Sequence, residues 1–130
     1  MVKFVSTFAA VAMLAAPFAG PTAALAHTKV VASTPEQDAT VKAPRSVTLT
    51  FSEALLPPTA AASIVMTAMP GMANHSPMII RNFKTAWSNG NKTMTLSLRQ
   101  PLRAGTYEVR WQAAGADGHR MKGTVNFLAN

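Results

Sequence analysis

Residues 46–52 read Ser-Val-Thr-Leu-Thr-Phe-Ser, and this alternation of polar and apolar side chains is typical of a β-strand with one buried face. Val47, Leu49 and Phe51 would point into a core, while the hydroxyl side chains between them would face water. The prolines at 57–58 cannot continue such a strand. This stretch therefore predicts one strand of a sheet that is buried on a single side.

Two later stretches, residues 93–98 and 106–112, repeat the same alternation. Their inward side chains would be Met94, Leu96 and Leu98 in the first stretch and Tyr107, Val109 and Trp111 in the second. Turn signals at residues 88–91 and 101–105 separate these strands from their neighbours. Further strand candidates are residues 28–32, 61–66 and 78–80 and the segment around Val125 and Phe127. Short strands between turns, with no convincing amphipathic helix after residue 26, predict an all-β sandwich.

The first 26 residues are typical of a secretory signal. An early lysine is followed by a mostly apolar run over residues 4–18 and by Ala-Leu-Ala, a small-x-small cleavage site that ends at Ala26. Proline and glycine interrupt the run before it reaches the ~20 apolar residues that a membrane span needs. We expect export and cleavage, which would leave one domain, residues 27–130, with His27 as its first residue.

Composition excludes several classes of function. The chain has 12 Lys+Arg and 5 Asp+Glu, so removal of the one lysine in the signal leaves a formal charge of 11 − 5 = +6. The basic residues are scattered singly and form no nucleic-acid motif, so a solvated basic surface is the better interpretation and we expect no nucleic-acid partner. The chain has no cysteine, which excludes disulfides and the thiolate of a blue-copper electron carrier.

A methionine-rich stretch follows the third strand candidate. Its sulfur and imidazole side chains recur every three residues, at Met66, Met69, Met72, His75 and Met78. Thioether sulfur is a soft, uncharged ligand that favours Cu(I), and imidazole also suits copper. Two prolines and a glycine make the stretch a poor core element, although methionines that fill core gaps are the alternative. A repeat of three fits polyproline II geometry, so we expect an extended loop that presents a Cu(I) site on the solvent side.

A second group of ligands brings together the two ends of the mature chain. His27 would offer an α-amine and an imidazole that chelate one metal, and Asp117 and His119 flank a glycine in a predicted loop. Nitrogen and oxygen ligands of this kind favour Cu(II). Glu53 could reach this site or orient a ligand, or it could be an exposed strand-end residue. Met121 could be a strand residue or a neighbour of the site.

Together with residues 49–53 (Leu-Thr-Phe-Ser-Glu) and 101–107 (Pro-Leu-Arg-Ala-Gly-Thr-Tyr), these motifs resemble the CopC/PcoC family of periplasmic copper-resistance proteins. The resemblance covers essentially the whole mature chain. It implies a seven-stranded Greek-key β-sandwich of the immunoglobulin-like kind, with two copper sites at opposite ends. By that likeness the four methionines and His75 are Cu(I) ligands, and His27, Asp117 and His119 bind Cu(II).

The resemblance implies a periplasmic copper carrier for copper resistance and homeostasis, and not an enzyme. We expect a monomer that passes metal to an inner-membrane copper transporter of the CopD kind or to a multicopper oxidase. The alternative is a copper monooxygenase of the lytic polysaccharide type, which also uses an N-terminal histidine on a β-sandwich. Such an enzyme needs a second imidazole and usually a flat aromatic face. This chain has one tyrosine and two tryptophans, of which Trp111 is assigned inward.

Overall fold

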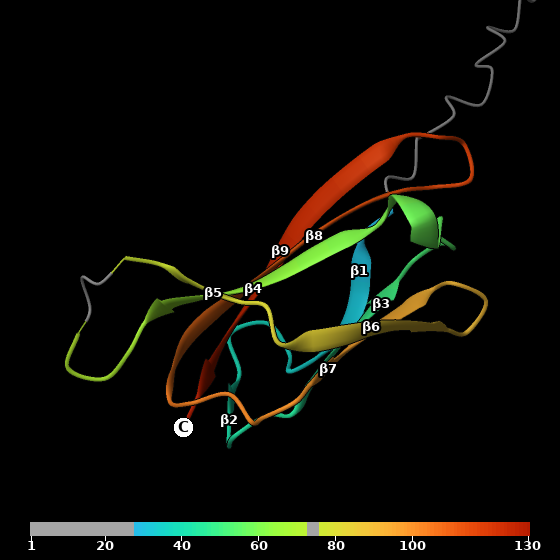
Figure 1. The fold of residues 1–130 in the computed structure, drawn as a ribbon. Helices are drawn as coiled ribbons and strands as arrows, with labels where there is room; N and C mark the ends of the chain where they lie inside the picture. The colour runs from blue at the N-terminus through green and yellow to red at the C-terminus, as the bar shows by residue number, and fades with distance from the viewer. Residues whose placement is uncertain (1–27, 73–75) are drawn as a thin grey trace, which may run out of the picture.

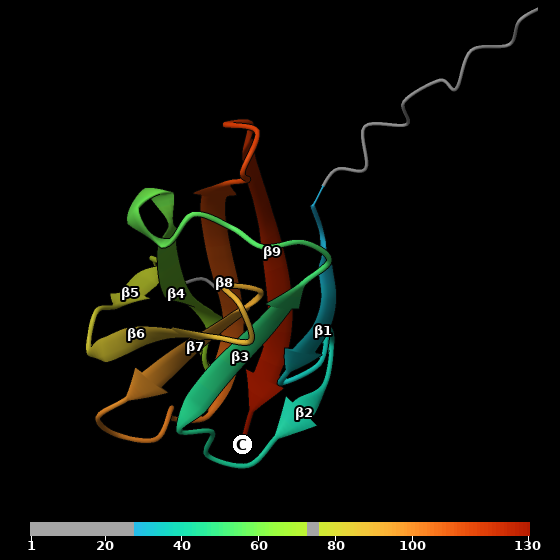
Figure 2. The ribbon, with the colours of Figure 1, turned by 90° about the vertical axis from the view of Figure 1, so that its right-hand side faces the viewer.

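The computed structural model describes residues 28–72 and 76–130, which form two β-sheets packed face to face (Figures 1 and 2). The strands are β1 (Val30–Thr34), β2 (Thr40–Val41), β3 (Ser46–Phe51), β4 (Ala61–Ala68), β5 (Met78–Ile80), β6 (Phe83–Ser88), β7 (Thr93–Leu98), β8 (Gly105–Ala114) and β9 (Arg120–Ala129), with a short 3₁₀ helix η1 (Pro57–Thr59) before β4. One sheet has the order β1-β3-β7-β6 and the other β2-β9-β8-β4-β5. The all-β sandwich expected from the alternating stretches is confirmed.

Strand positions agree with the sequence where the alternation is strong and differ where it is weak. The described residues form nine strands, of which β2 and β5 have only two and three residues, so seven longer strands remain. Strand β6 was not predicted, because only Phe83 and Trp87 are half-buried and the residues between them are exposed. The short strand β2 lies outside every strand candidate named from the sequence. Strand β1 begins and ends two residues later than the predicted first strand.

The core lies between the sheets and consists of the side chains that the alternation places inward. Phe51 packs edge-to-face on Trp111, with ring centroids 4.8 Å apart, and Tyr107 stacks on Phe127 at 5.5 Å. Met94 is fully buried, as its position in the alternation predicts. Such aromatic pairs contribute about 0.5–1.5 kcal/mol each beyond the area that they bury. No helix among the described residues is long and apolar enough to cross a membrane.

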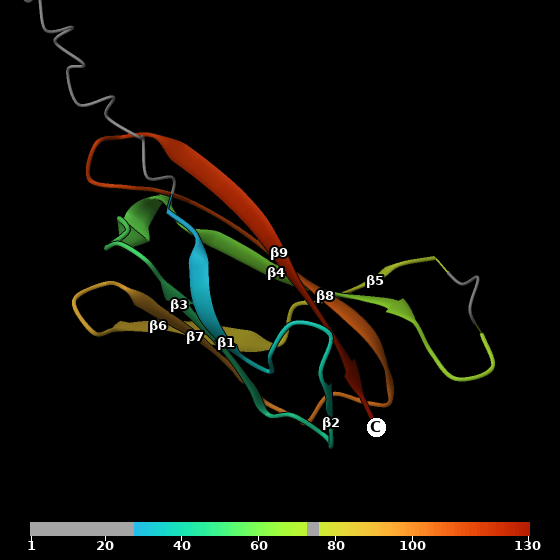
Figure 3. The same cartoon turned by 180° about the vertical axis from the view of Figure 1, so that it is seen from behind.

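The longest ladder joins β8 to β9 and runs from the pair Gly105–Ala129 to the pair Ala114–Arg120 (Figure 3). Strand β4 pairs with the other edge of β8 and continues into a hairpin with β5, which projects from one end of the sandwich (Figure 1). The β8–β9 loop lies at the opposite end of this ladder. The two predicted ligand groups are therefore associated with opposite ends of β8.

Position 123 has no room for a residue larger than glycine, because Trp111 occupies the space beside it. The two residues face each other across the β8–β9 ladder, and a Cβ on Gly123 would lie 2.8 Å from Nε1 and Cζ2 of the indole. Gly123→Ala should therefore overpack the core and lower the free energy of unfolding by about 1–3 kcal/mol in urea titrations. Thr124→Ala, at the exposed neighbouring position, is the control and should change it by about 0.5 kcal/mol. Equal stability of the two variants would contradict the packing described.

Candidate metal centres

The methionine-rich stretch forms the end of the β4–β5 hairpin. Met69 and Met72 pair across a turn in which the Met72 N–H donates to the Met69 carbonyl oxygen at 3.0 Å. Pro70 and Gly71 occupy the centre of this turn, and Gly71 has a φ of 78°, as a type II turn requires. The three-residue spacing here is thus that of a tight turn. The prediction of a continuous extended loop was wrong for residues 66–72.

Met66 belongs to the core, which corrects the prediction that all four methionines lie on the solvent side. It stands in β4 opposite Met78 of β5, and only 3% of it is exposed. Its Cε lies 3.3 Å from the place that a Cβ on Gly105 would occupy. By contrast Met78 is 51% and Met72 56% exposed, as expected for the solvent side. The regular sequence spacing therefore conceals two different environments.

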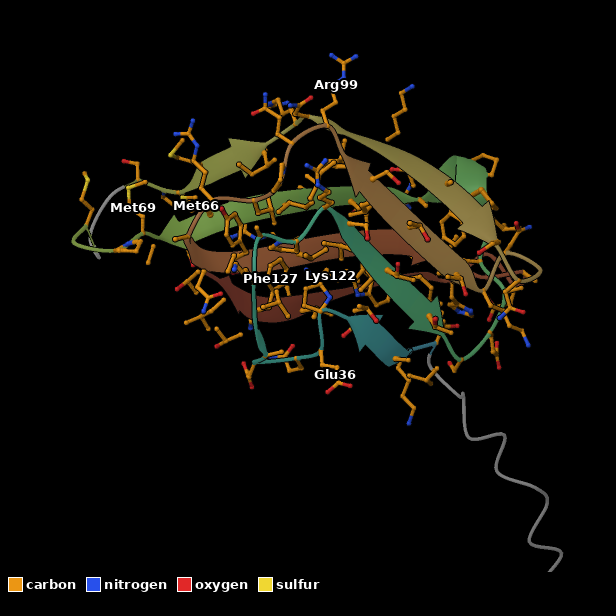
Figure 4. All side chains as sticks on the ribbon, turned by 90° about the horizontal axis from the view of Figure 1, so that it is seen from below. Glu36, Met66, Met69, Arg99, Lys122 and Phe127 are labelled. Carbon is orange, nitrogen blue, oxygen red and sulfur yellow. The ribbon has the colours of Figure 1, made fainter. Side chains whose placement is uncertain are left out.

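Three of the four methionines meet in one groove of about 330 Å³. Met66 lies at its buried side, Met69 is half-buried farther out along the hairpin (Figure 4), and Met78 comes from β5. The apolar side chains that complete the lining are Ile79, Ile80, Leu98, Pro101, Leu102 and Tyr107. Met72 is not part of the lining. His75 lies outside the described residues, so its place relative to the groove is not assigned.

Tyr107 lines the groove with a phenol that carries no charge. Its hydroxyl donates to the carbonyl oxygen of Arg103 at 2.7 Å. Burial raises the pKa of Tyr107 above its ordinary value of 10.0, an effect that the nearby charge of Arg103 only partly opposes. The phenol therefore stays protonated at neutral pH, and the soft donors of the groove are its thioethers.

Asp117 and His119 meet in the loop between β8 and β9. The Nδ1 of His119 lies 2.8 Å from Oδ2 of Asp117, and the His119 backbone N–H donates to Oδ1 at 3.0 Å. A turn closed by the Gly118 N–H and the Gly115 carbonyl oxygen, at 2.9 Å, makes this possible, with Gly118 at a φ of 81°. Both side chains are exposed. The hydrogen bonds from His119, its side chain first, hold the pKa of Asp117 below its ordinary value of 3.8.

Met121 is a neighbour of this loop that the sequence left undecided. Its Sδ accepts a hydrogen bond from the backbone N–H of Thr28 at 3.1 Å, and Thr28 is buried, with 6% exposed. The Cε of Met121 also lies 3.6 Å from the place of a Cβ on Gly115, at the base of the loop. The only sequence signal was a thioether two residues after His119. The contact brings the backbone that follows His27 to strand β9.

The remaining acid of this end, Glu53, is exposed and makes no contact that assigns it a role. It follows Ser52, whose Oγ accepts the Lys29 N–H at 3.1 Å and whose own N–H donates to the Lys29 carbonyl oxygen at 2.8 Å. Glu53 is therefore near the start of the described chain, whereas His27 itself lies outside it. Within residues 28–72 and 76–130, no three His, Cys, Asp or Glu side chains gather as a metal site would require.

Comparison with known proteins agrees with this architecture. The family model described as CopC domain matches residues 30–130. "Copper resistance protein C" of Pseudomonas syringae pv. tomato is 44% identical over 127 residues, which cover 96% of this chain and 93% of the relative. Its namesake in Xanthomonas campestris pv. juglandis is 39% identical and covers 98% of each chain.

A solved structure shares the fold as well as the sequence. The crystal structure of PcoC, described as a methionine-rich copper resistance protein from Escherichia coli, superposes with a TM-score of 0.72 at 37% identity. The match covers 81% of this chain and 100% of PcoC. A family model that spans most of the chain, relatives near 40% identity and a shared sandwich lead to one conclusion: the chain belongs to the CopC family.

Proposed function

We propose that this chain is a periplasmic copper carrier of copper resistance and homeostasis, without catalytic activity. It would bind Cu(I) in the methionine groove and Cu(II) beside the β8–β9 loop. The observation that carries the proposal is the convergence of Met66, Met69 and Met78 on one groove. The names of its relatives, copper resistance protein C and a methionine-rich copper resistance protein, support it.

The groove suits Cu(I) because its ligands are soft and differ in mobility. Met66 is fixed by the core, so its sulfur needs little ordering on binding. Met69 and Met78 come from the two arms of the hairpin, and we propose Met72 and His75 as further donors. Thioethers remain neutral at every pH, so no proton is released when they bind and the bound site keeps the charge of the ion.

The Cu(II) site would use His27 and the β8–β9 loop. Cleavage after Ala26 frees an α-amine, and amine and imidazole of His27 then form one chelate. Asp117 engages Nδ1 of His119, which leaves Nε2 as the ligand atom; a carboxylate in this role fixes the ring and increases its basicity. Asp117 would thus orient His119 and offer its remaining oxygen lone pairs to the ion.

The carrier would act as a monomer and deliver copper to an inner-membrane transporter of the CopD kind or to a multicopper oxidase. Exposed thioethers on a hairpin permit exchange of one ligand at a time. The polysaccharide monooxygenase is the weaker alternative. Trp111 and Tyr107 are buried, with 5% and 0% exposed, so neither contributes to the flat aromatic face that such an enzyme presents to its substrate.

Substitution of the groove methionines tests the Cu(I) site. Replacing Met66, Met69 and Met78 together by leucine should weaken Cu(I) binding by roughly 100-fold, or ~2.7 kcal/mol. Leucine keeps the volume of methionine, so the fold should persist at a cost below about 1.5 kcal/mol per site. Anaerobic competition with a chromogenic Cu(I) chelator measures the affinity. Met94→Leu, buried outside the groove, is the matched control and should bind normally. Full affinity in the triple variant would exclude these three thioethers as ligands.

Acidification tests the Cu(II) site. The amine and imidazole of His27, with unperturbed pKa values of roughly 7.7–8.0 and 6.5, must lose their protons to bind copper, so Cu(II) affinity should fall steeply between about pH 8 and 5. Because the pKa of Asp117 is lowered from 3.8, its carboxylate stays ionised over this range and contributes nothing to the fall. Isothermal titration at several pH values tests this. One extra residue before His27 should abolish tight binding; unchanged affinity would remove the amine from the site.

Substitution of Met121 tests its contact with Thr28. Met121→Leu preserves volume but removes the sulfur acceptor of the buried Thr28 N–H. If that contact holds the N-terminal segment against β9, Cu(II) affinity should fall by roughly 3- to 10-fold, the equivalent of one lost hydrogen bond. Cu(I) affinity at the groove is the internal control and should not change. Equal Cu(II) affinity in variant and wild type would show that the sulfur anchors nothing that the site needs.

A further inference from the structure

The methionine groove carries positive charge that no neighbouring carboxylate neutralises. Arg81 and Arg103 are its charged lining residues, and both are exposed. None of the acidic residues of the described chain lines it. Neither arginine forms an ion pair among the described residues, where Arg110 pairs with Glu108 on another part of the surface. The groove therefore presents two available guanidinium groups beside three thioethers.

The same groove is bordered by exposed apolar side chains on a sheet edge. Strand β5 is the last strand of the five-stranded sheet in the described structure. Its Met78 and Ile79 are 51% and 53% exposed, although they are large apolar residues in succession. Edge strands of this kind readily pair with an added strand.

We propose that this groove, with the β5 edge, docks an acidic, methionine-bearing segment of the protein that exchanges copper with this chain. The inference rests on the proposed function, because it assigns a partner to the same groove. Three features determine the chemistry of the partner: carboxylates for Arg81 and Arg103, apolar side chains for Met78 and Ile79, and an extended backbone for the strand edge.

The charges of the groove link docking of the acidic segment to the transfer of Cu(I). Cu(I) held by neutral thioethers keeps its positive charge, and the two guanidinium groups nearby oppose it. An acidic segment neutralises the arginines as it docks and brings its own sulfur ligands next to those of the hairpin. Its carboxylates also accelerate encounter, since complementary charges raise association rates at low salt. An anionic membrane would match the charge but not a concave groove beside a free strand edge.

The test uses metal-free mature protein and a synthetic twelve-residue peptide with four glutamates and two methionines. Fluorescence anisotropy of the labelled peptide should show binding that weakens at least about tenfold between low and high salt, as expected for charge pairing at an exposed surface. The same peptide with glutamine in place of each glutamate should bind much more weakly. Equal binding of both peptides, or of neither, would overturn the proposal.

Charge-reversal variants locate the interaction. Arg81→Glu with Arg103→Glu should weaken binding of the acidic peptide by about tenfold or more. The matched control, Lys92→Glu with Lys122→Glu, produces the same change in net charge at exposed sites outside the groove and should change binding less than about twofold. If the control loses as much affinity as the groove variant, only net charge matters and the docking site is refuted.

Two further measurements separate this inference from the proposed function. Cu(I) affinity of the wild type, by chelator competition, decides whether the groove binds copper, while peptide binding to metal-free protein is measured independently of it. If the wild type binds the peptide but has no Cu(I) affinity, the Cu(I) carrier function is refuted and the docking site is not. Vesicles with 30% phosphatidylglycerol are the third arm: strong binding to vesicles that Arg81→Glu with Arg103→Glu abolishes, with no peptide binding, would identify a lipid surface and overturn the protein partner.

Discussion

The antiparallel pairing of β8 with β9 is the constraint on which the rest of the molecule depends. Ten consecutive pairs, from Gly105–Ala129 to Ala114–Arg120, span about 30 Å at the rise of an extended chain. One end of this ladder supports the methionine hairpin through β4, and the other end forms the loop that holds Asp117 and His119. The core attaches to the same ladder, because its inward side chains stack on those of β3 and β7. The two proposed copper sites are therefore associated with opposite ends of the longest ladder of the fold.

Much of this fold could be predicted because polar and apolar residues alternate along a strand when one of its faces is buried. This alternation placed Met94 in the core and Trp111 inward, and both are buried. It failed for β6, where exposed residues follow one another between Phe83 and Trp87. Pairing with β7 and the packing of these two side chains against the core maintain the strand. The sequence also could not separate Met66 from Met78, since a regular spacing contains no information on which arm of a hairpin continues into the core. Such distinctions arise from tertiary pairing, which one sequence does not display.

For the candidate sites, the sequence predicts the type of each donor atom but not the contacts that position it. Donor type alone suggested which oxidation state each group would suit, because softness is a property of the side chain. The hydrogen bond between Asp117 and His119 depends on a turn with a glycine at positive φ, and the proposed role of Asp117 in orienting the ring rests on that geometry. The contact between Met121 and Thr28 joins residues 93 positions apart, so no local pattern announced it.

In the proposed Cu(I) site, unequal burial of the sulfurs imposes an order on release. Met78 lies on an exposed edge and can rotate away without disturbing the core, whereas Met66 is held by Gly105 and its neighbours. An incoming ligand would therefore replace Met78 first, then Met69 at the turn, and Met66 last. Each exchange substitutes one neutral sulfur for another, so no step creates a buried charge. In the function proposed above, such a carrier would retain its ion through the buried ligand and release it only to a partner that supplies several donors in sequence.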